Sequence, residues 1–195
     1  MPLAELNGIA IRRIRAPEDV TRWRAGFVGT YQTVFSGFPY FERFYPSEAE
    51  GVFQRLVSLD DNIVLVATRG NSQVVALAAA TPLSTMPSVA NHLAGLVPVP
   101  HTFYLAELGV LERFRGLGIG RALVRERLRL IDDERYSHVV LRVSTSHTPS
   151  GEMYKAMGFE EMGVDQEVSA MRTNGKVRTD RRMFLSKVLS QVDLP

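Results

Sequence analysis

The feature that most constrains this chain is a glycine-rich stretch, Arg115-Gly116-Leu117-Gly118-Ile119-Gly120, placed between two regular elements. Residues 103–110 before it form an apolar run typical of a strand, and residues 118–133 after it have helical periodicity. The first-turn N–H groups of a helix have no intrahelical acceptor and carry partial positive charge. Glycine lets a phosphate approach the backbone without meeting a Cβ. The strand, the turn and the helix together therefore predict a pyrophosphate-binding site.

Two familiar pyrophosphate motifs fit this stretch poorly. A Rossmann fingerprint needs a glycine where Arg121 stands and an acidic residue near the end of the next strand, which ends in Ser144 instead. A P-loop needs Lys-Ser or Lys-Thr after its last glycine, and the sequence lacks that pair. An ordinary glycine-rich turn into a helix remains an alternative.

Two motifs resemble the GNAT N-acetyltransferase superfamily. Arg115-x-x-Gly118-x-Gly120 is similar to its R/Q-x-x-G-x-G/A coenzyme A loop. Tyr154-Lys155-Ala156-Met157-Gly158-Phe159 resembles its Y-x-x-x-G-F segment and follows the loop after a helix and a strand, in the family order. Residues 182–189 resemble the closing strand. The resemblance is most specific over residues 103–159, and the order of the elements fits along the whole chain.

The resemblance implies an α/β fold of mixed α+β type. Its central sheet would be mixed, mostly antiparallel, with about seven strands splayed between the fourth and the fifth, and with about four flanking helices. The patterns place strands at 9–14, 63–69, 73–81, 103–110, 138–143 and in a final pair, and helices at 17–35, 47–59, 118–133 and 150–157. The tight turn Asn174-Gly175 joins the final pair.

We expect residues 1–195 to form one domain with an extra segment at about 82–101, between the third and fourth strands. A connection this long is usually functional or has secondary structure of its own. A short helix could occupy residues 88–96. The segment is either a lid or wall of an acceptor pocket, or else a surface excursion or a dimer contact.

Composition excludes several classes of protein. Cysteine is absent, so the chain has no disulfide framework and no thiol nucleophile. No apolar run reaches about 18 residues, and the first residues lack the pattern of a signal peptide. We therefore expect a cytoplasmic protein without a membrane partner. The net charge is only +2 and no basic patch is interleaved with aromatics, so nucleic acid is not an expected partner. The histidines are too scattered to predict a metal site.

The resemblance also implies acetyl-CoA as the cofactor and assigns residues to it. The pantetheine arm would lie along the fourth strand, held by the main chain of Leu108, Gly109 and Val110, with Gly109 at a bulge. The pyrophosphate would lie on the loop and the start of the helix, formed by Arg115, Gly116, Leu117, Gly118, Ile119, Gly120 and Arg121. Many relatives have Asn where this chain has His147, which could donate one hydrogen bond or act as a base, or could be an exposed loop residue.

Two residues are candidates for proton transfer. Glu107 is the only acid inside an apolar strand and would be the general base, directly or through water, because burial raises a carboxyl pKa towards neutral. Alternatively, Glu107 pairs with an arginine and only shapes the pocket. Tyr154 falls on the tyrosine of the motif and would return a proton to the departing thiolate. Alternatively, it is a packing residue whose hydroxyl contacts the coenzyme.

The resemblance implies an acetyl-CoA-dependent N-acetyltransferase in which a primary amine attacks the thioester directly in a ternary complex. A small-molecule amine is the leading acceptor. The alternatives are a peptide or protein N-terminal acetyltransferase and a non-catalytic coenzyme A-binding module. Phe38, Tyr40 and Phe41 lie between the first two helices, where similar proteins line the acceptor site, although these aromatics could simply be core. By analogy with similar proteins, the chain is also a candidate homodimer.

Overall fold

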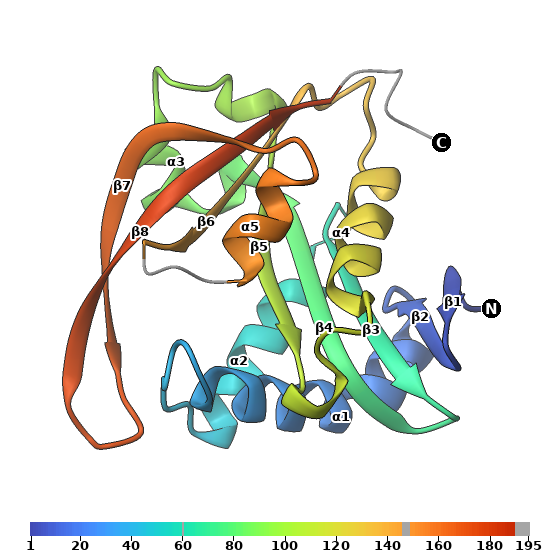
Figure 1. Cartoon of the computed structure of the whole chain (residues 1–195). Helices are drawn as coiled ribbons and strands as arrows, with labels where there is room; N and C mark the ends of the chain where they lie inside the picture. The colour runs from blue at the N-terminus through green and yellow to red at the C-terminus, as the bar shows by residue number, and fades with distance from the viewer. Residues whose placement is uncertain (60, 146–148, 190–195) are drawn as a thin grey trace. The chain divides into compact units, whose positions relative to one another are not determined.

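The structure is a computed structural model that describes residues 1–59, 61–145 and 149–189. This part of the chain contains eight strands, five α-helices and three short 3-10 helices (Figure 1). It divides into two compact units, and each is described by itself. The first unit consists of residues 1–80, 107–130 and 171–176, and the second takes the described residues of 81–106, 131–170 and 177–195.

Four strands of the first unit lie in chain order and pair antiparallel with one another. They are β1 (Ala4–Leu6), β2 (Ile9–Arg13), β3 (Ile63–Arg69) and most of β4 (Gln73–Pro82). The unit also holds the end of β5 (Thr102–Val110), the helices α1 (Pro17–Ser36), α2 (Pro46–Val57) and α4 (Ile119–Leu130), and the short helix η3 (Glu112–Phe114). Residues 63–67 of β3 are all buried, as expected of a strand covered on both faces.

An aromatic stripe on α1 forms the core of the first unit. Trp23, Phe27, Tyr31 and Phe35 follow one another at four-residue spacing, so they lie on one face of the helix. All four are buried, and they cluster with residues of α2, β3 and β4. The rings of Phe27 and Phe53 of α2 lie 4.9 Å apart. This packing fixes α1 against the sheet of its unit.

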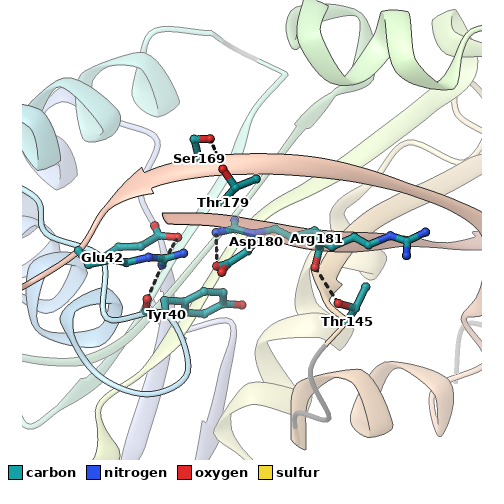
Figure 2. Close-up of polar contacts among 9 residues, drawn as sticks. Tyr40, Glu42, Thr145, Ser169, Thr179, Asp180 and Arg181 are labelled. Atoms are coloured by element: carbon teal, nitrogen blue, oxygen red, sulfur yellow. Dashed lines mark hydrogen bonds and ion pairs between the residues drawn. The ribbon is translucent and has the colours of Figure 1, made fainter. Parts of the chain in front are cut away.

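The second unit contains the start of β5, β6 (His138–Ser144), β7 (Glu160–Met171) and β8 (Val177–Val188), with α3 (Pro87–Leu93), α5 (Pro149–Lys155), η1 (Leu83–Thr85) and η2 (Val99–His101). Strands β5 and β6 run parallel, whereas β6 and β8 are antiparallel and β8 is flanked by β7. The hydroxyls of Ser169 and Thr179 lie 2.7 Å apart between β7 and β8 (Figure 2).

The predicted fold class is confirmed. The sheet is mixed and mostly antiparallel, and all seven expected strands are present. Strands β5 and β6 pair in parallel from Thr102↔His138 to Tyr104↔Val140, and the splay between them stays a prediction. One strand is additional: β1 pairs with β2 through the turn Asn7-Gly8. The short helix considered for residues 88–96 is present as α3, which begins at Pro87 and ends at Leu93.

The extra segment is packed rather than extended. Leu83, Val89 and Leu93, from η1 and α3, are fully buried and cluster with Val140 and Phe184 of the second unit. The segment therefore has its own secondary structure and a part in the core. Its role as a lid or wall, and the single-domain organisation, stay predictions. None of the helices in the described part of the chain is long and apolar enough to cross a membrane.

Candidate functional site

The glycine loop has the backbone conformation of an anion site. Gly116 and Gly118 have φ of 77° and 79°, in the left-handed region that favours glycine. Nothing lies within 4 Å of the position that a Cβ at Gly116 would take, so this turn is open. Helix α4 begins at Ile119, and its first intrahelical bond runs from the Ala122 N–H to the Gly118 carbonyl, at 3.0 Å.

The N–H groups before Ala122 are therefore the ones without an intrahelical acceptor, and the helix dipole adds positive charge to them. Gly116, Leu117, Gly118 and Arg121 are exposed, which leaves the loop open to a phosphate from solvent. Ile119 is only 2% exposed, so its side chain belongs to the core and only its main chain could bind a ligand. The structure brings the predicted loop residues together at the start of one helix.

Arg115 is exposed, but its guanidinium makes hydrogen bonds within the protein. Its Nε donates to the Val110 carbonyl at 3.0 Å, and its Nη1 donates to the Phe38 carbonyl at 3.4 Å. These bonds hold the loop to the end of β5 and to the connection between α1 and α2. The arginine of the motif therefore holds the loop in place.

The end of β5 lies against α1 at Gly109. A Cβ on Gly109 would lie 2.7 Å from Cγ1 of Val34, closer than real atoms approach. Gly109 is buried, whereas Leu108 and Val110 on either side are partly exposed. The close approach of α1 therefore explains why position 109 is a glycine, without any need for a bulge. The predicted bulge stays a prediction.

Glu107 is half-buried beside an aromatic cluster. The Tyr31 hydroxyl donates to Oε1 of Glu107 over 3.5 Å. The Tyr31 ring is fixed by Phe35, at 4.5 Å between centroids, and by Phe44, at 5.1 Å. Burial, helped by the charges of Glu107 and Glu42, raises the pKa of Tyr31. Tyr31 therefore keeps its proton and remains a donor.

Arg127 is a buried guanidinium that the sequence analysis missed. It is 0% exposed, and its Nη1 donates to the carbonyls of Ala79 and Glu107, each at 3.0 Å. Buried charges persist in proteins where they are well hydrogen-bonded. Through Arg127, helix α4 thus fixes the main chain of β4 at Ala79 and the main chain of β5 at Glu107, the predicted base.

The connection between α1 and α2 carries the predicted acceptor residues. Phe38 and Phe41 are 57% and 48% exposed, and their rings meet edge to face at 6.3 Å. Tyr40 is half-buried and packs against Phe35 at 5.5 Å. Phe41 has a φ of 51°, which is rare for a bulky residue and costs energy. The loop therefore holds two apolar rings out towards solvent.

A buried ion pair fixes this connection. Arg172 Nη1 lies 3.5 Å from Oε1 of Glu42, and the two side chains are only 5% and 9% exposed. The same nitrogen donates to the Tyr40 carbonyl (Figure 2, dashed lines at Tyr40 and Glu42). Main-chain bonds add to it, from the Arg43 N–H to Met171 and from the Thr173 N–H to Phe41, both at 2.8 Å. The turn after β7 and the α1–α2 connection thus form one structure within the first unit.

Tyr154 belongs to the second unit. It lies on α5, is 4% exposed, and packs edge to face against Phe159 at 5.4 Å between centroids. Its main-chain carbonyl accepts from Met157 and Phe159. Its burial on this motif fits either predicted role, as the acid or as a packing residue. His147 lies outside the described residues.

Sequence periodicity held signals for two of the missed residues. Tyr31 stands four residues after Phe27 and four before Phe35, on the aromatic stripe of α1. Arg127 stands four residues after Leu123 and four before Ile131, on the buried face of α4. Glu42 and Arg172 had no such signal, because their pairing joins positions 130 residues apart.

Comparisons with known protein sequences identify the family to which this chain belongs. The profile of the Acetyltransferase (GNAT) family matches residues 30–159. N-acetyltransferase 8F1 of Rattus norvegicus is 38% identical over 98 residues, which cover 50% of this chain and 39% of that protein. Mycothiol acetyltransferase of Acidothermus cellulolyticus is 40% identical over 58 residues, 30% of this chain and 18% of that one. The chain thus spans well under half of these relatives.

A solved structure shares the fold. The ribosomal-protein-alanine N-acetyltransferase of Brucella melitensis superposes with a TM-score of 0.66 at 22% identity, covering 92% of this chain and 99% of that one. At this identity the likeness concerns the fold alone.

Proposed function

Because this chain belongs to the GNAT acetyltransferase family, we propose that it is an N-acetyltransferase that moves the acetyl group of acetyl-CoA to a primary amine of a small molecule. One observation carries the proposal. The turn at Gly116 and Gly118 leads into the first turn of α4, and only the short helix η3 separates it from the strand that carries Glu107. An anion-binding loop and a half-buried acid therefore belong to one unit.

The loop suits the pyrophosphate of coenzyme A, because Gly116, Gly118 and Arg121 are exposed and nothing lies within 4 Å of the Cβ position of Gly116. We assign the pyrophosphate to the main chain from Gly116 to Arg121, with Arg115 holding the loop in place. Leu108, Gly109 and Val110 offer main-chain groups to the pantetheine arm. The bound coenzyme supplies an acetyl group activated as a thioester. His147 remains a candidate coenzyme contact on its sequence position alone.

Glu107 is the proposed base. An amine is protonated near neutral pH and must lose a proton before it can attack a carbonyl carbon. The Glu107 carboxylate would take that proton, directly or through one water, and become neutral; before the transfer it accepts a hydrogen bond from the Tyr31 hydroxyl. The sequence contains no cysteine, which argues against an acetyl-cysteine intermediate; an acetylated serine or tyrosine is the alternative to the direct attack by the amine that we propose.

Tyr154 is the proposed acid, and this assignment is based on the motif. A phenol with a pKa near 10 can give its proton to a departing thiolate. The hydroxyl oxygen of Tyr154 would supply that proton and recover one from solvent afterwards.

Phe38, Tyr40 and Phe41 are the proposed acceptor contacts. Phe38 and Phe41 have exposed rings, and Arg115 ties the Phe38 carbonyl to the coenzyme loop. An amine that carries an apolar or ring-bearing group would bury that group against these rings. Tyr40 would act mainly through its packing on Phe35.

The experiment is thiol release from acetyl-CoA with a panel of amines: aminoglycosides, polyamines, amino acids, arylalkylamines and short peptides with free N-termini. Turnover with a small amine above the hydrolysis background supports the proposal. Turnover with peptides alone would replace it by a peptide N-terminal acetyltransferase. Silence across the panel, with acetyl-CoA still raising the melting temperature, would favour a binding module.

Two variants test the roles of the residues. We expect Glu107→Gln to lose about 10²- to 10⁴-fold in kcat, the usual contribution of a general base. Glu112→Gln removes an exposed acid five residues along the chain and serves as the matched control. Tyr154→Phe should lower kcat far more than the affinity for acetyl-CoA, and equal small effects on both would reject its role as the acid.

A further inference from the structure

Glu107 is held at two points. Its main-chain carbonyl accepts a hydrogen bond from Arg127 Nη1 at 3.0 Å, and the same nitrogen bonds to Ala79 on the neighbouring stretch of β4. Its carboxylate faces the Tyr31 hydroxyl over 3.5 Å. Arg127 thus fixes the strand backbone at Glu107, and Tyr31 supplies a donor to its carboxylate.

The donor in this contact is itself rigid. Tyr31 is 4% exposed, and its ring is enclosed by Phe27 and Phe35 from its own helix and by Phe44 after it. A ring packed on several sides cannot swing its hydroxyl away from the strand. The hydroxyl also keeps its proton, since burial and neighbouring carboxylates raise the pKa of Tyr31.

We propose that Tyr31 is a positioning residue for Glu107: its hydroxyl fixes one carboxylate oxygen, so that the other is aimed at the acceptor amine. This inference rests on the proposed function only in taking Glu107 as the base. A contact of 3.5 Å is long for two oxygens, and such bonds often shorten when a substrate enters. Tyr31 itself would not touch the substrate.

Charged groups from three other parts of the first unit act on this contact. Glu42 follows α1, Arg55 lies on α2, and both influence Tyr31 through their charge. Arg127 approaches Glu107 from α4. A hydrogen bond from Tyr31 to the ionised carboxylate favours the ionised form, so its loss should make Glu107 easier to protonate.

The test is Tyr31→Phe, which removes one oxygen and keeps the ring. Its matched control is Tyr45→Phe, the same change on a tyrosine that is 54% exposed. The first readout is the titration of the glutamate carboxyl carbons by NMR, with the Glu107 signal identified by its absence in Glu107→Gln. In Tyr31→Phe we expect the midpoint of that signal to rise by at least about 0.5 pH units, and in Tyr45→Phe to stay unchanged.

The second readout is the pH profile of kcat/KM for the acceptor. We expect its acidic limb to move to higher pH in Tyr31→Phe and kcat to fall about 10- to 100-fold, with the affinity for acetyl-CoA unchanged. In the Glu107→Gln background Tyr31→Phe should cost nothing more. An unchanged Glu107 midpoint would overturn the inference whatever the activity. A raised midpoint in a protein that acetylates no amine would uphold the contact and reject the proposed function instead.

Discussion

Gly109→Ala tests whether the close approach of α1 to β5 is as tight as the structure has it. The new Cβ would lie 2.7 Å from Cγ1 of Val34, and 3.2 and 3.3 Å from its Cβ and Cγ2. Carbon atoms pack best at about 3.5–4.0 Å, so α1 would have to retreat by roughly 1 Å or Val34 would have to leave its rotamer. Overpacking of this kind costs about 1–3 kcal/mol.

A part of that cost is offset, because replacing glycine by alanine lowers the conformational entropy of the unfolded chain. This effect stabilises the folded protein by about 0.4–1 kcal/mol. We therefore expect the free energy of unfolding to fall by about 1–2 kcal/mol. Gly29→Ala is the matched control. Gly29 lies in α1 with nothing within 4 Å of its Cβ position, and its substitution should raise stability by about 0.5–1 kcal/mol.

Urea unfolding of the single variants and of the double variant measures the effect. Val34→Ala removes the two methyl groups that clash and costs about 1.6 kcal/mol or more by itself. In the double variant the methyl group added at position 109 occupies that space, so the combined loss should be smaller than the sum by at least about 1 kcal/mol. Strictly additive losses, or a Gly109→Ala protein as stable as the parent, would refute the packing argument.

Three further predictions concern the same unit. Arg172→Met removes the cation beside the buried Glu42 carboxylate and should cost about 3–5 kcal/mol in urea unfolding; Glu42→Gln in the same chain should restore most of this stability. Gly118→Val places a branched side chain at a φ of 79° and should abolish acetyl-CoA binding by calorimetry; retained affinity would reject the pyrophosphate assignment. Burial raises the pKa of Tyr31, so the unfolded chain ionises first, and stability should fall above about pH 10 more steeply in the parent than in Tyr31→Phe; equal slopes of melting temperature against pH would contradict this.

The elements that the sequence predicted correctly are those with local causes. The glycine loop and the turn at Asn174-Gly175 are specified by glycines with positive φ, and β3 and β4 by continuous apolar runs on either side of the turn at Gly70. Strand β1 was missed although its turn, Asn7-Gly8, has the same chemistry, with φ of 51° and 73°. Its three residues are too few to show an alternating pattern.

The parts that could not be predicted depend on distant partners. Arg127 is on the buried face of α4 by periodicity, but a charge on such a face is usually solvated. Its hydrogen bonds to the carbonyls of Ala79 and Glu107, 48 and 20 residues away in the sequence, help to make its burial tolerable. The sequence therefore predicted Glu107 as an acid within a strand, but not the Tyr31 phenol and the Arg127 guanidinium that contact it.

The pairing of the α1–α2 connection with the turn after β7 has a consequence for how the chain is made. Arg172 reaches the Tyr40 carbonyl across 132 positions of sequence. At about 5–20 residues per second, a ribosome adds that length in about 7–26 s. During this interval Glu42 and Phe41 have left the ribosome without the segment that later fixes them. Closure of this connection is thus a late event in the biogenesis of the protein, and a chain that stops short of residue 171 would emerge with the connection open.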